Sequence, residues 1–209
     1  KSERFIRKVK RIMAKKIKIT RDDVMPMEQY GALRAGRRKN MAAYKKSRRV
    51  HVGPDATFYF ESFETMWHQV HEMLYIERGG EEQIADELNA YNPLIPKGRE
   101  LVATLMFEID DEDRRGKFLA GLGGVEETVT ITLGDEVIRG VPEEDVDRTS
   151  AEGKASSVQF LHFPFTDGQV ALFRDPGIKA VLAIEHPKYG HMTVIAKQAR
   201  DSLLADFST

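Results

Sequence analysis

The sequence predicts an α+β protein, with a mixed or antiparallel sheet packed against several helices in a single compact unit that carries a basic N-terminal arm. Two observations support this fold class. A chain of 209 residues, of which 41% are hydrophobic, can form one substantial core, so two domains are not required. Helical and strand-like segments are also interspersed without the regular βαβ period of a doubly wound sheet, and the chain has no internal repeat.

The helices are predicted from apolar spacing and from end signals. The clearest one covers residues 61–78, and Gly79 and Gly80 supply its stop. Its apolar residues at helical spacing are Phe63, Trp67, Val70 and Leu74. A basic helix is expected at 27–46, although Gly31 and Gly36 weaken it. The other predicted helices are 81–90, 111–120, 166–173 and 193–207.

The strands are predicted from β-branched and aromatic residues bounded by turn residues. These segments are 49–52, 57–60, 101–109, 128–133, 136–139, 157–163 and 179–184. Gly134 and Asp135 favour a tight hairpin between two of them. The acidic, polar stretch 142–156 is expected to be a loop, and proline and glycine indicate a turn within 185–191.

Charge is distributed unevenly along the chain. Residues 1–50 contain 18 Lys and Arg against 4 Asp and Glu, whereas the rest of the chain contains 14 against 29. This asymmetry divides the sequence into a flexible N-terminal extension at 1–16, a basic helical arm at 17–50 and an acidic α+β body at 51–209.

Composition excludes several classes of protein. The chain contains no cysteine, which excludes disulfides, cysteine nucleophiles and iron–sulfur clusters held by this chain. Any metal would need nitrogen and oxygen ligands. No apolar run approaches the roughly 18 residues of a membrane span, and no signal-peptide core follows the basic N-terminus. We therefore expect a cytoplasmic protein without a membrane partner.

One face of the helix at 61–78 carries four side chains that can bind a metal or move protons. Glu64, His68, His71 and Glu72 fall within an arc of about 100° on a helical wheel. Such neighbours can converge on one divalent ion, with iron, manganese and zinc as candidates. A single helix cannot complete the site. The candidate ligands from elsewhere in the chain are His162, His186 and His191.

Two other interpretations of this face remain open. The residues could form a metal-free acid/base or ligand site, or an ordinary solvated helix face whose histidines bond to backbone carbonyls. Against the solvated face, no Lys or Arg occurs between Arg49 and Arg78, whereas an exposed helix usually intersperses both signs of charge. The spacing also matches none of the stronger metal-binding motifs.

The basic arm is a candidate binding surface for an anion or a protein partner. Its candidate residues are Arg37, Arg38, Arg48 and Arg49. Nucleic acid attracts such arms, but no DNA- or RNA-binding motif accompanies this one, and the acidic body would repel a phosphate backbone. Docking on the acidic body and a solvated helix face are the other interpretations, and the charge pattern favours them over nucleic acid.

Several stretches together resemble the bacterial "domain of unknown function 3501" family over about residues 17–207. They are Val52-Gly53-Pro54, 57–61, 66–74 around Trp67, 92–96, His186-Pro187 and Tyr189-Gly190-His191. The family has no established activity. The resemblance implies a cytoplasmic companion of rubrerythrin-like and iron–sulfur oxidoreductase proteins, which would fit iron or peroxide metabolism.

These observations lead to three hypotheses of function. The first is a metal-associated protein with a His/Glu site, serving as a component of iron or peroxide redox metabolism. The second is a non-catalytic interaction protein that binds a redox partner or another copy of itself. The third is a nucleic-acid accessory protein that acts through the basic arm. The sequence assigns no reaction or substrate to any of them.

Overall fold

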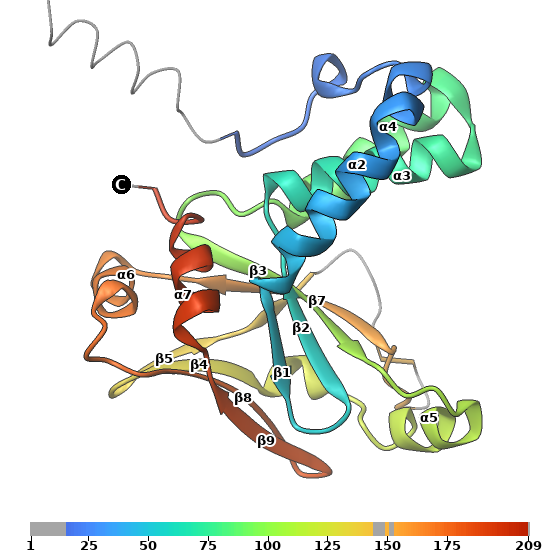
Figure 1. Ribbon diagram of the computed structural model, residues 1–209. Coiled ribbons are helices and arrows are strands. Elements are labelled where there is room, and N and C mark those ends of the chain that lie inside the picture. The colour runs from blue at the N-terminus through green and yellow to red at the C-terminus, as the bar shows by residue number, and fades with distance from the viewer. Residues whose placement is uncertain (1–15, 144–148, 151–152, 209) are drawn as a thin grey trace, which may run out of the picture.

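A computed structural model describes residues 16–143, 149–150 and 153–208. Two antiparallel sheets and a layer of helices make up an α+β protein, which confirms the predicted fold class (Figure 1). Residues 1–15, most of the predicted N-terminal extension, lie outside the described residues. None of the helices within the described ranges is both long enough and apolar enough to cross a membrane.

The strands form two sheets in which every neighbouring pair is antiparallel. The five-stranded sheet has the order β1-β2-β3-β7-β6 and the four-stranded sheet the order β5-β4-β8-β9. The larger sheet contains β1 Arg49–Val52, β2 Ala56–Phe60, β3 Glu100–Phe107, β7 Val158–Pro164 and β6 Val141–Pro142. The smaller sheet contains β5 Glu136–Arg139, β4 Val129–Leu133, β8 Ala180–His186 and β9 Tyr189–Val194.

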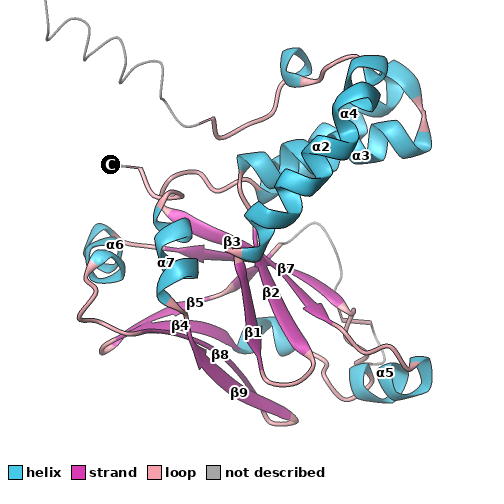
Figure 2. Ribbon diagram, in the orientation of Figure 1, coloured by secondary structure: helices cyan, strands magenta, loops and turns pink. Residues whose placement is uncertain are grey.

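The helices occupy two kinds of place around these sheets. Helices α2, α3 and α4 form a layer at one end of the molecule, whereas α5, α6 and α7 lie around the strands (Figure 2). The α-helices are α2 Met27–Lys46, α3 Phe63–Glu77, α4 Gly80–Tyr91, α5 Glu112–Leu119, α6 Asp167–Arg174 and α7 Lys197–Leu204. Short 3-10 helices are η1 Arg21–Asp23, η2 Asn92–Leu94 and η3 Val125–Thr128.

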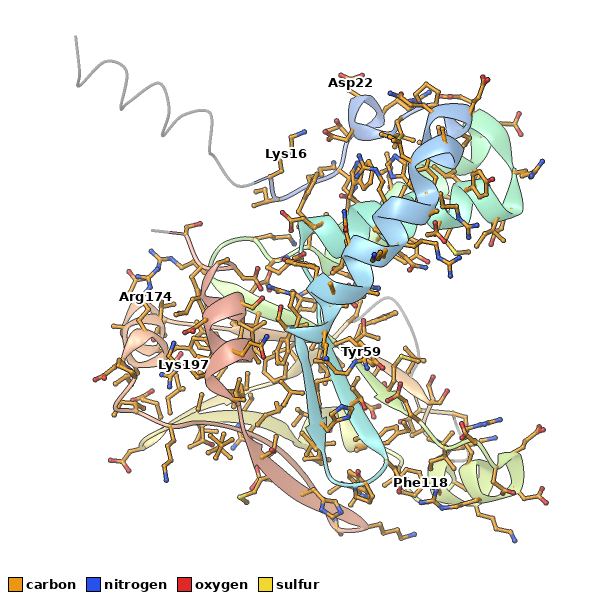
Figure 3. All side chains as sticks on the ribbon, viewed as in Figure 1. Lys16, Asp22, Tyr59, Phe118, Arg174 and Lys197 are labelled. Atoms are coloured by element: carbon orange, nitrogen blue, oxygen red, sulfur yellow. The ribbon has the colours of Figure 1, made fainter. Side chains whose placement is uncertain are left out.

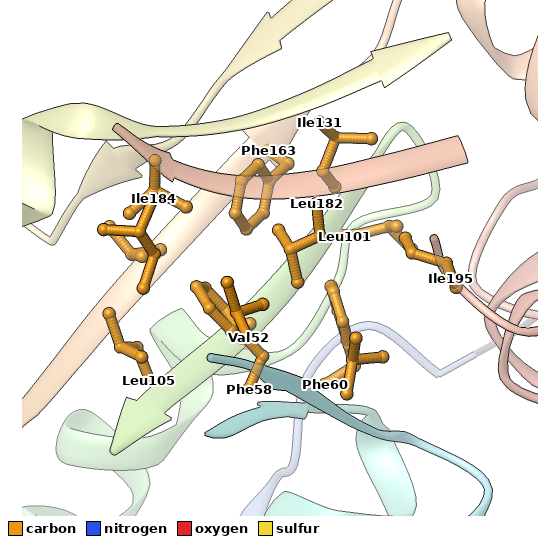
Figure 4. Close-up of a cluster of buried hydrophobic side chains, with 14 of the residues drawn as sticks. Val52, Phe58, Phe60, Leu101, Leu105, Ile131, Phe163, Leu182, Ile184 and Ile195 are labelled. Atoms are coloured by element: carbon orange, nitrogen blue, oxygen red, sulfur yellow. The ribbon is translucent and has the colours of Figure 1, made fainter. Parts of the chain in front are cut away.

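The main hydrophobic core fills the space between the two sheets (Figure 4). Leu101 and Leu105 of β3 point into it and are fully buried, as are Phe58 of β2, Ile131 of β4 and Leu182 of β8. Burying a side chain of this size contributes about 2 kcal/mol. The alternating strands of the sequence therefore form a sandwich.

A second core lies on the opposite face of β3. Val102 points away from the sandwich and packs with Met66, Val70 and Leu74 of α3. Successive side chains of a strand point to opposite faces, so β3 is covered on both sides. This strand holds the helical layer against the sandwich.

The segment predicted as a basic arm is integrated into the helical layer. Ile19 and Tyr30 are fully buried. The side chain of Asn92 accepts a hydrogen bond from the backbone nitrogen of Ile19 at 2.7 Å and donates to its carbonyl at 3.0 Å. Helix α2 then packs along α3. The apolar and polar contacts of this segment are thus made within the chain.

Helix α3 begins and ends close to the predicted positions. The Ser62 hydroxyl accepts a hydrogen bond from the backbone nitrogen of Thr65 at 3.2 Å, and the Thr65 hydroxyl accepts one from the backbone nitrogen of Ser62 at 2.8 Å. The helix ends where Arg78 adopts a left-handed conformation with φ 57°. Gly79 was expected to supply that turn, but the backbone reverses one residue earlier and Gly80 starts α4.

The prediction for the C-terminal region was wrong in two places. Instead of a turn at 185–191 followed by a helix at 193–207, strand β8 continues to His186 and β9 runs from Tyr189 to Val194. Two residues suffice to connect antiparallel strands, and the buried Tyr189 anchors the second one. Helix α7 therefore covers only Lys197–Leu204. The start of the segment 142–156, which was predicted to be a loop, is also part of a strand: Val141 and Pro142 form β6 and pair with β7.

Candidate functional site

The most polar contact between α2 and α3 centres on the carboxylate of Glu72. It accepts hydrogen bonds from the Tyr30 hydroxyl at 2.7 Å and from Arg34 at 2.9 Å and 2.8 Å, the last two as a bidentate pair. These bonds from Arg34, joined by the one from Tyr30, lower the pKa of Glu72. Burial and the bond to Glu72 raise the pKa of Tyr30. Glu72, one of the predicted metal ligands, is therefore paired with an arginine of the basic helix.

His71 lies fully buried next to this pair. Its Nε2 accepts a hydrogen bond from the backbone nitrogen of Met25 at 3.1 Å, so its Nδ1 carries the hydrogen and donates to the carbonyl of Trp67 at 2.7 Å. The ring stacks 3.7 Å from that of Trp67. Burial lowers the pKa of His71 to about 4. Both ring nitrogens of a neutral imidazole are thus occupied.

His68 differs from His71 because only one of its ring nitrogens has a partner. Nδ1 lies 3.3 Å from the hydroxyl oxygen of Tyr30. The hydrogen of that hydroxyl is directed to Glu72, so Nδ1 must be the donor to Tyr30 and Nε2 must carry the lone pair. Nε2 has no hydrogen-bond partner within the described ranges and is not sealed from solvent. Burial lowers the pKa of His68, although Glu72 opposes the shift.

A cleft of about 470 Å³ lies between α2 and α3, beside His68. Its lining residues are Lys16, Asp23, Arg37, Asn40, Met41, Tyr44, Phe63, Glu64, Trp67 and His68. The guanidinium of Arg37 stacks 4.5 Å from the ring centre of Trp67. Lys16 lies on the segment that precedes η1, at the edge of the helical layer (Figure 3), and pairs with Asp23. Polar groups and aromatic rings thus share one cavity.

Arg37 has no ion-pair partner among the residues that the structure describes. It forms no hydrogen bond and no ion pair with any residue in the described part of the chain. Its Nε is buried and unpartnered, whereas the two terminal nitrogens are not buried. A guanidinium usually binds a carboxylate or a phosphate when it is partly withdrawn from water. The cleft therefore contains a stacked cation with two free donor nitrogens.

The histidines predicted to complete a metal site lie on β7, β8 and β9, away from α3, and each contacts a partner there. His162 on β7 lies 3.0 Å from Glu100 and 2.8 Å from Glu143. His191 packs on Tyr189, with 4.5 Å between the ring centres, and His186 accepts a bond from the backbone of Lys188. Over residues 16–143, 149–150 and 153–208, no three His, Asp or Glu side chains are grouped so that they could hold a metal. Metal binding by His68, His71, Glu64 and Glu72 therefore rests on the sequence pattern alone.

The four predicted anion-binding arginines do not form one surface. Arg37 lines the cleft, Arg38 is exposed at 3.9 Å from Glu72, and Arg49 lies over the ring of Tyr59. Arg48 is only 1% exposed. It donates to the carbonyls of Phe60, Glu61 and Ser202 and pairs with Asp206, so it is unavailable to a partner.

Three residues of this site were not singled out as functional from the sequence. Tyr30 and Arg34 supply the partners of Glu72, and Trp67 was taken only as a core residue. A signal for the first two is visible in hindsight: Tyr30, Arg34 and Arg37 recur at helical spacing along one face of α2. That face contacts α3.

Comparison with known proteins places the chain in a family. The model of the family described as "Protein of unknown function (DUF3501)" matches residues 18–207. A crystal structure of a novel protein of unknown function from Burkholderia pseudomallei K96243 is 34% identical in sequence, with a TM-score of 0.84, over 91% of this chain and 99% of that one. None of the curated proteins compared with the chain matches it. The chain belongs to the family of proteins of unknown function DUF3501.

Proposed function

We propose that the protein binds a small organic anion in the cleft between α2 and α3, with Arg37 as the group that holds the anionic end. The observation that carries this proposal is the free guanidinium of Arg37, stacked on Trp67 in a cavity. Leaving a partly buried charged donor without a hydrogen bond costs about 1–3 kcal/mol or more. A carboxylate bound to the two terminal nitrogens, which are not buried, offsets that cost with two parallel charge-assisted hydrogen bonds.

The walls of the cleft favour an apolar or aromatic body on the ligand. Phe63, Trp67, Tyr44 and Met41 provide three rings and a thioether side chain. A volume of about 470 Å³ lies in the range of cavities that enclose small organic molecules. Aromatic walls with a few convergent polar groups fix both the position and the orientation of such a ligand. An arylalkyl carboxylate combines these two features.

The charges around the cleft favour an anion over a cation. Asp23 is already paired with Lys16 and accepts further bonds from Thr20. Glu64 is exposed, and its carboxylate accepts a long hydrogen bond of 3.5 Å from the Tyr44 hydroxyl. Arg38 and Lys45 add positive charge close enough to act on the pKa of His68. Of the two cations that line the cleft, Lys16 is paired with Asp23, whereas Arg37 has no ion-pair partner among the described residues.

A fluorescence titration tests the proposal directly, because Trp67 is the single tryptophan of the chain. Phenylacetate, an aryl ring with one carboxylate, is expected to change Trp67 emission with a saturable curve in the wild type. Arg37→Met keeps a flexible apolar side chain over the indole but removes the charge, so it should weaken phenylacetate binding at least about tenfold, in line with the loss of a charge-assisted bond.

Arg38→Met is the matched control, since it removes a neighbouring charge on the exposed side of the same helix. It should leave the affinity for phenylacetate within about twofold of the wild type, as a screened surface charge would. Isothermal calorimetry should give the same affinities as fluorescence. Equal binding by the wild type and Arg37→Met, or no saturable binding to the wild type by either method, would overturn the proposal.

A further inference from the structure

We propose that the ligand of this cleft carries a hydrogen-bond donor on the carbon next to its carboxylate, and that the Nε2 atom of His68 accepts that hydrogen bond. This inference rests on the anion-binding function proposed above and narrows its ligand class. The class is the α-hydroxy or α-amino acids with an aryl or apolar side chain. Plain carboxylates would then be the weaker ligands.

The hydrogen bonds around His68 determine which of its two ring nitrogens carries the hydrogen. Arg34 holds Glu72 as a carboxylate, and Glu72 takes the hydrogen of the Tyr30 hydroxyl. The oxygen of Tyr30 can then only accept from His68. For a neutral ring, this chain of bonds leaves one tautomer of His68, with the hydrogen on Nδ1 and the lone pair on Nε2. The protein thereby fixes an acceptor and not a donor at the cleft.

Burial and neighbouring positive charges keep the imidazole ring of His68 uncharged. Burial lowers the pKa of His68, and the positive charges of Lys45, Arg38 and Arg37 act in the same direction while Glu72 opposes them. A neutral imidazole keeps its lone pair near neutral pH. Nε2 therefore offers its lone pair to any donor that enters the cleft.

The cleft contains two groups that complement each other, a guanidinium that donates hydrogen bonds and an imidazole nitrogen that accepts one. Arg37 and His68 both line the cleft, on facing helices, and the ring of Trp67 lies under the guanidinium. A ligand whose carboxylate binds Arg37 can direct its adjacent carbon toward the α3 wall of the cleft, on which His68 lies. A donor on that carbon satisfies Nε2, which otherwise loses its water without gaining a partner.

Either a hydroxyl or an ammonium group of the ligand would supply the donor. The effect of Glu64 on affinity distinguishes these two ligand classes. Its carboxylate lines the same cleft and has no cationic partner in the described part of the chain. Attraction between Glu64 and a ligand ammonium would favour an α-amino acid, whereas a hydroxyl gains little from it. Glu64→Gln should therefore weaken an amino-acid ligand and leave a hydroxy-acid ligand unchanged.

Three probes of nearly equal size test the inference. Phenylacetate, mandelate and phenylglycine share the aryl ring and the carboxylate and differ only in the group on the adjacent carbon. In the wild type, Trp67 fluorescence should show that mandelate or phenylglycine binds about fivefold tighter than phenylacetate, the size expected for one net hydrogen bond. Each enantiomer of the two chiral probes is measured separately.

Two variants of His68 distinguish the acceptor from a structural role. His68→Phe removes the acceptor, whereas His68→Gln can place its amide oxygen near the position of Nε2. Both variants lose the Nδ1 contact with Tyr30, so loss of that contact affects them alike. The preference for the donor-bearing probe, measured as the ratio of its affinity to that of phenylacetate in the same variant, should vanish in His68→Phe and persist in His68→Gln.

The outcomes separate this inference from the proposed function. Saturable but equal binding of all three probes to the wild type overturns the inference and leaves the anion site in place. A preference that survives in His68→Phe also overturns it. Absence of binding by every probe overturns both proposals. If His68→Phe does not fold, the comparison of probes in the wild type still decides.

Discussion

Acid sensitivity of the helical layer is the sharpest consequence of the buried His71. Its pKa is about 4 in the folded protein, against 6.5 for an ordinary histidine. A group with a depressed folded pKa stabilises the fold above its unfolded pKa, and this contribution is lost as pH falls from 6.5 toward 4. Between pH 7.5 and pH 5.0 the linkage relation gives a loss of about 2 kcal/mol from this residue alone.

The perturbation that isolates this contribution is His71→Gln, measured by urea unfolding at a series of pH values. The variant is less stable than the wild type at pH 7.5, because it loses the stacking with Trp67. Its stability should nevertheless fall less on acidification, so that the gap between the two proteins narrows by about 2 kcal/mol at pH 5.0. Other groups titrate equally in both proteins and cancel in the difference. Parallel stability curves would refute the reasoning, since they would mean that His71 is protonated at no cost.

Three further predictions follow from other contacts. Burial opposes the shift, but the hydrogen bonds that His162 donates to Glu100 and Glu143 raise its pKa above 6.5. The stabilisation by His162 is therefore complete below pH 6.5 and is lost as pH rises through the raised pKa. Urea unfolding of His162→Gln should accordingly show a larger deficit at pH 5.5 than at pH 8.5, and an equal deficit would contradict the ion pairs. Arg48→Met leaves the buried carboxylate of Asp206 without its guanidinium and should cost about 3–5 kcal/mol in the same assay; a loss below about 1 kcal/mol would mean that water reaches the pair. Metal analysis of the purified protein is expected to find substoichiometric iron, manganese and zinc, because both ring nitrogens of His71 are occupied. A stoichiometric metal that disappears in the His68→Ala/His71→Ala double variant would restore the predicted metal site.

Local patterns in the sequence were sufficient to predict where α3 begins and ends. Apolar spacing located the helix within two residues at its start and one at its end, and it placed His68 and His71 beside the apolar stripe, where they are indeed buried. The pattern could not reveal what lies opposite. The partner of this face is α2, whose contact residues include arginines that look solvent-exposed in a sequence.

Gly31 illustrates why the sequence alone could not single out docking of α2 from the other interpretations of the basic arm. In the sequence it weakens a helix, because glycine gains conformational freedom on unfolding. In the structure a Cβ at this position would lie 2.9 Å from a ring carbon of Tyr75. The residue that lowers the helix propensity is thus the one that lets the two helices approach.

The distribution of the histidines could not be predicted, because it depends on strand register. His162 meets Glu100 only because β3 and β7 pair antiparallel with Val102 opposite His162. No local spacing encodes that alignment. Likewise, β9 was mistaken for a turn and a helix because Tyr189, which fixes it, makes its hydrogen bonds with backbone groups of β1 and β2 and of the turn between them, more than 130 positions away.

The buried Arg48, which directly precedes β1, also sets an order of events during synthesis. Arg48 and Asp206 are separated by 158 positions, so at usual elongation rates the guanidinium leaves the ribosome roughly ten to thirty seconds before its carboxylate. Until then the charge must stay hydrated, and the nascent chain cannot seal β1 beneath α7. Closure of the sandwich over β1 therefore waits until Asp206 has emerged, and until then this flank of the nascent chain stays open.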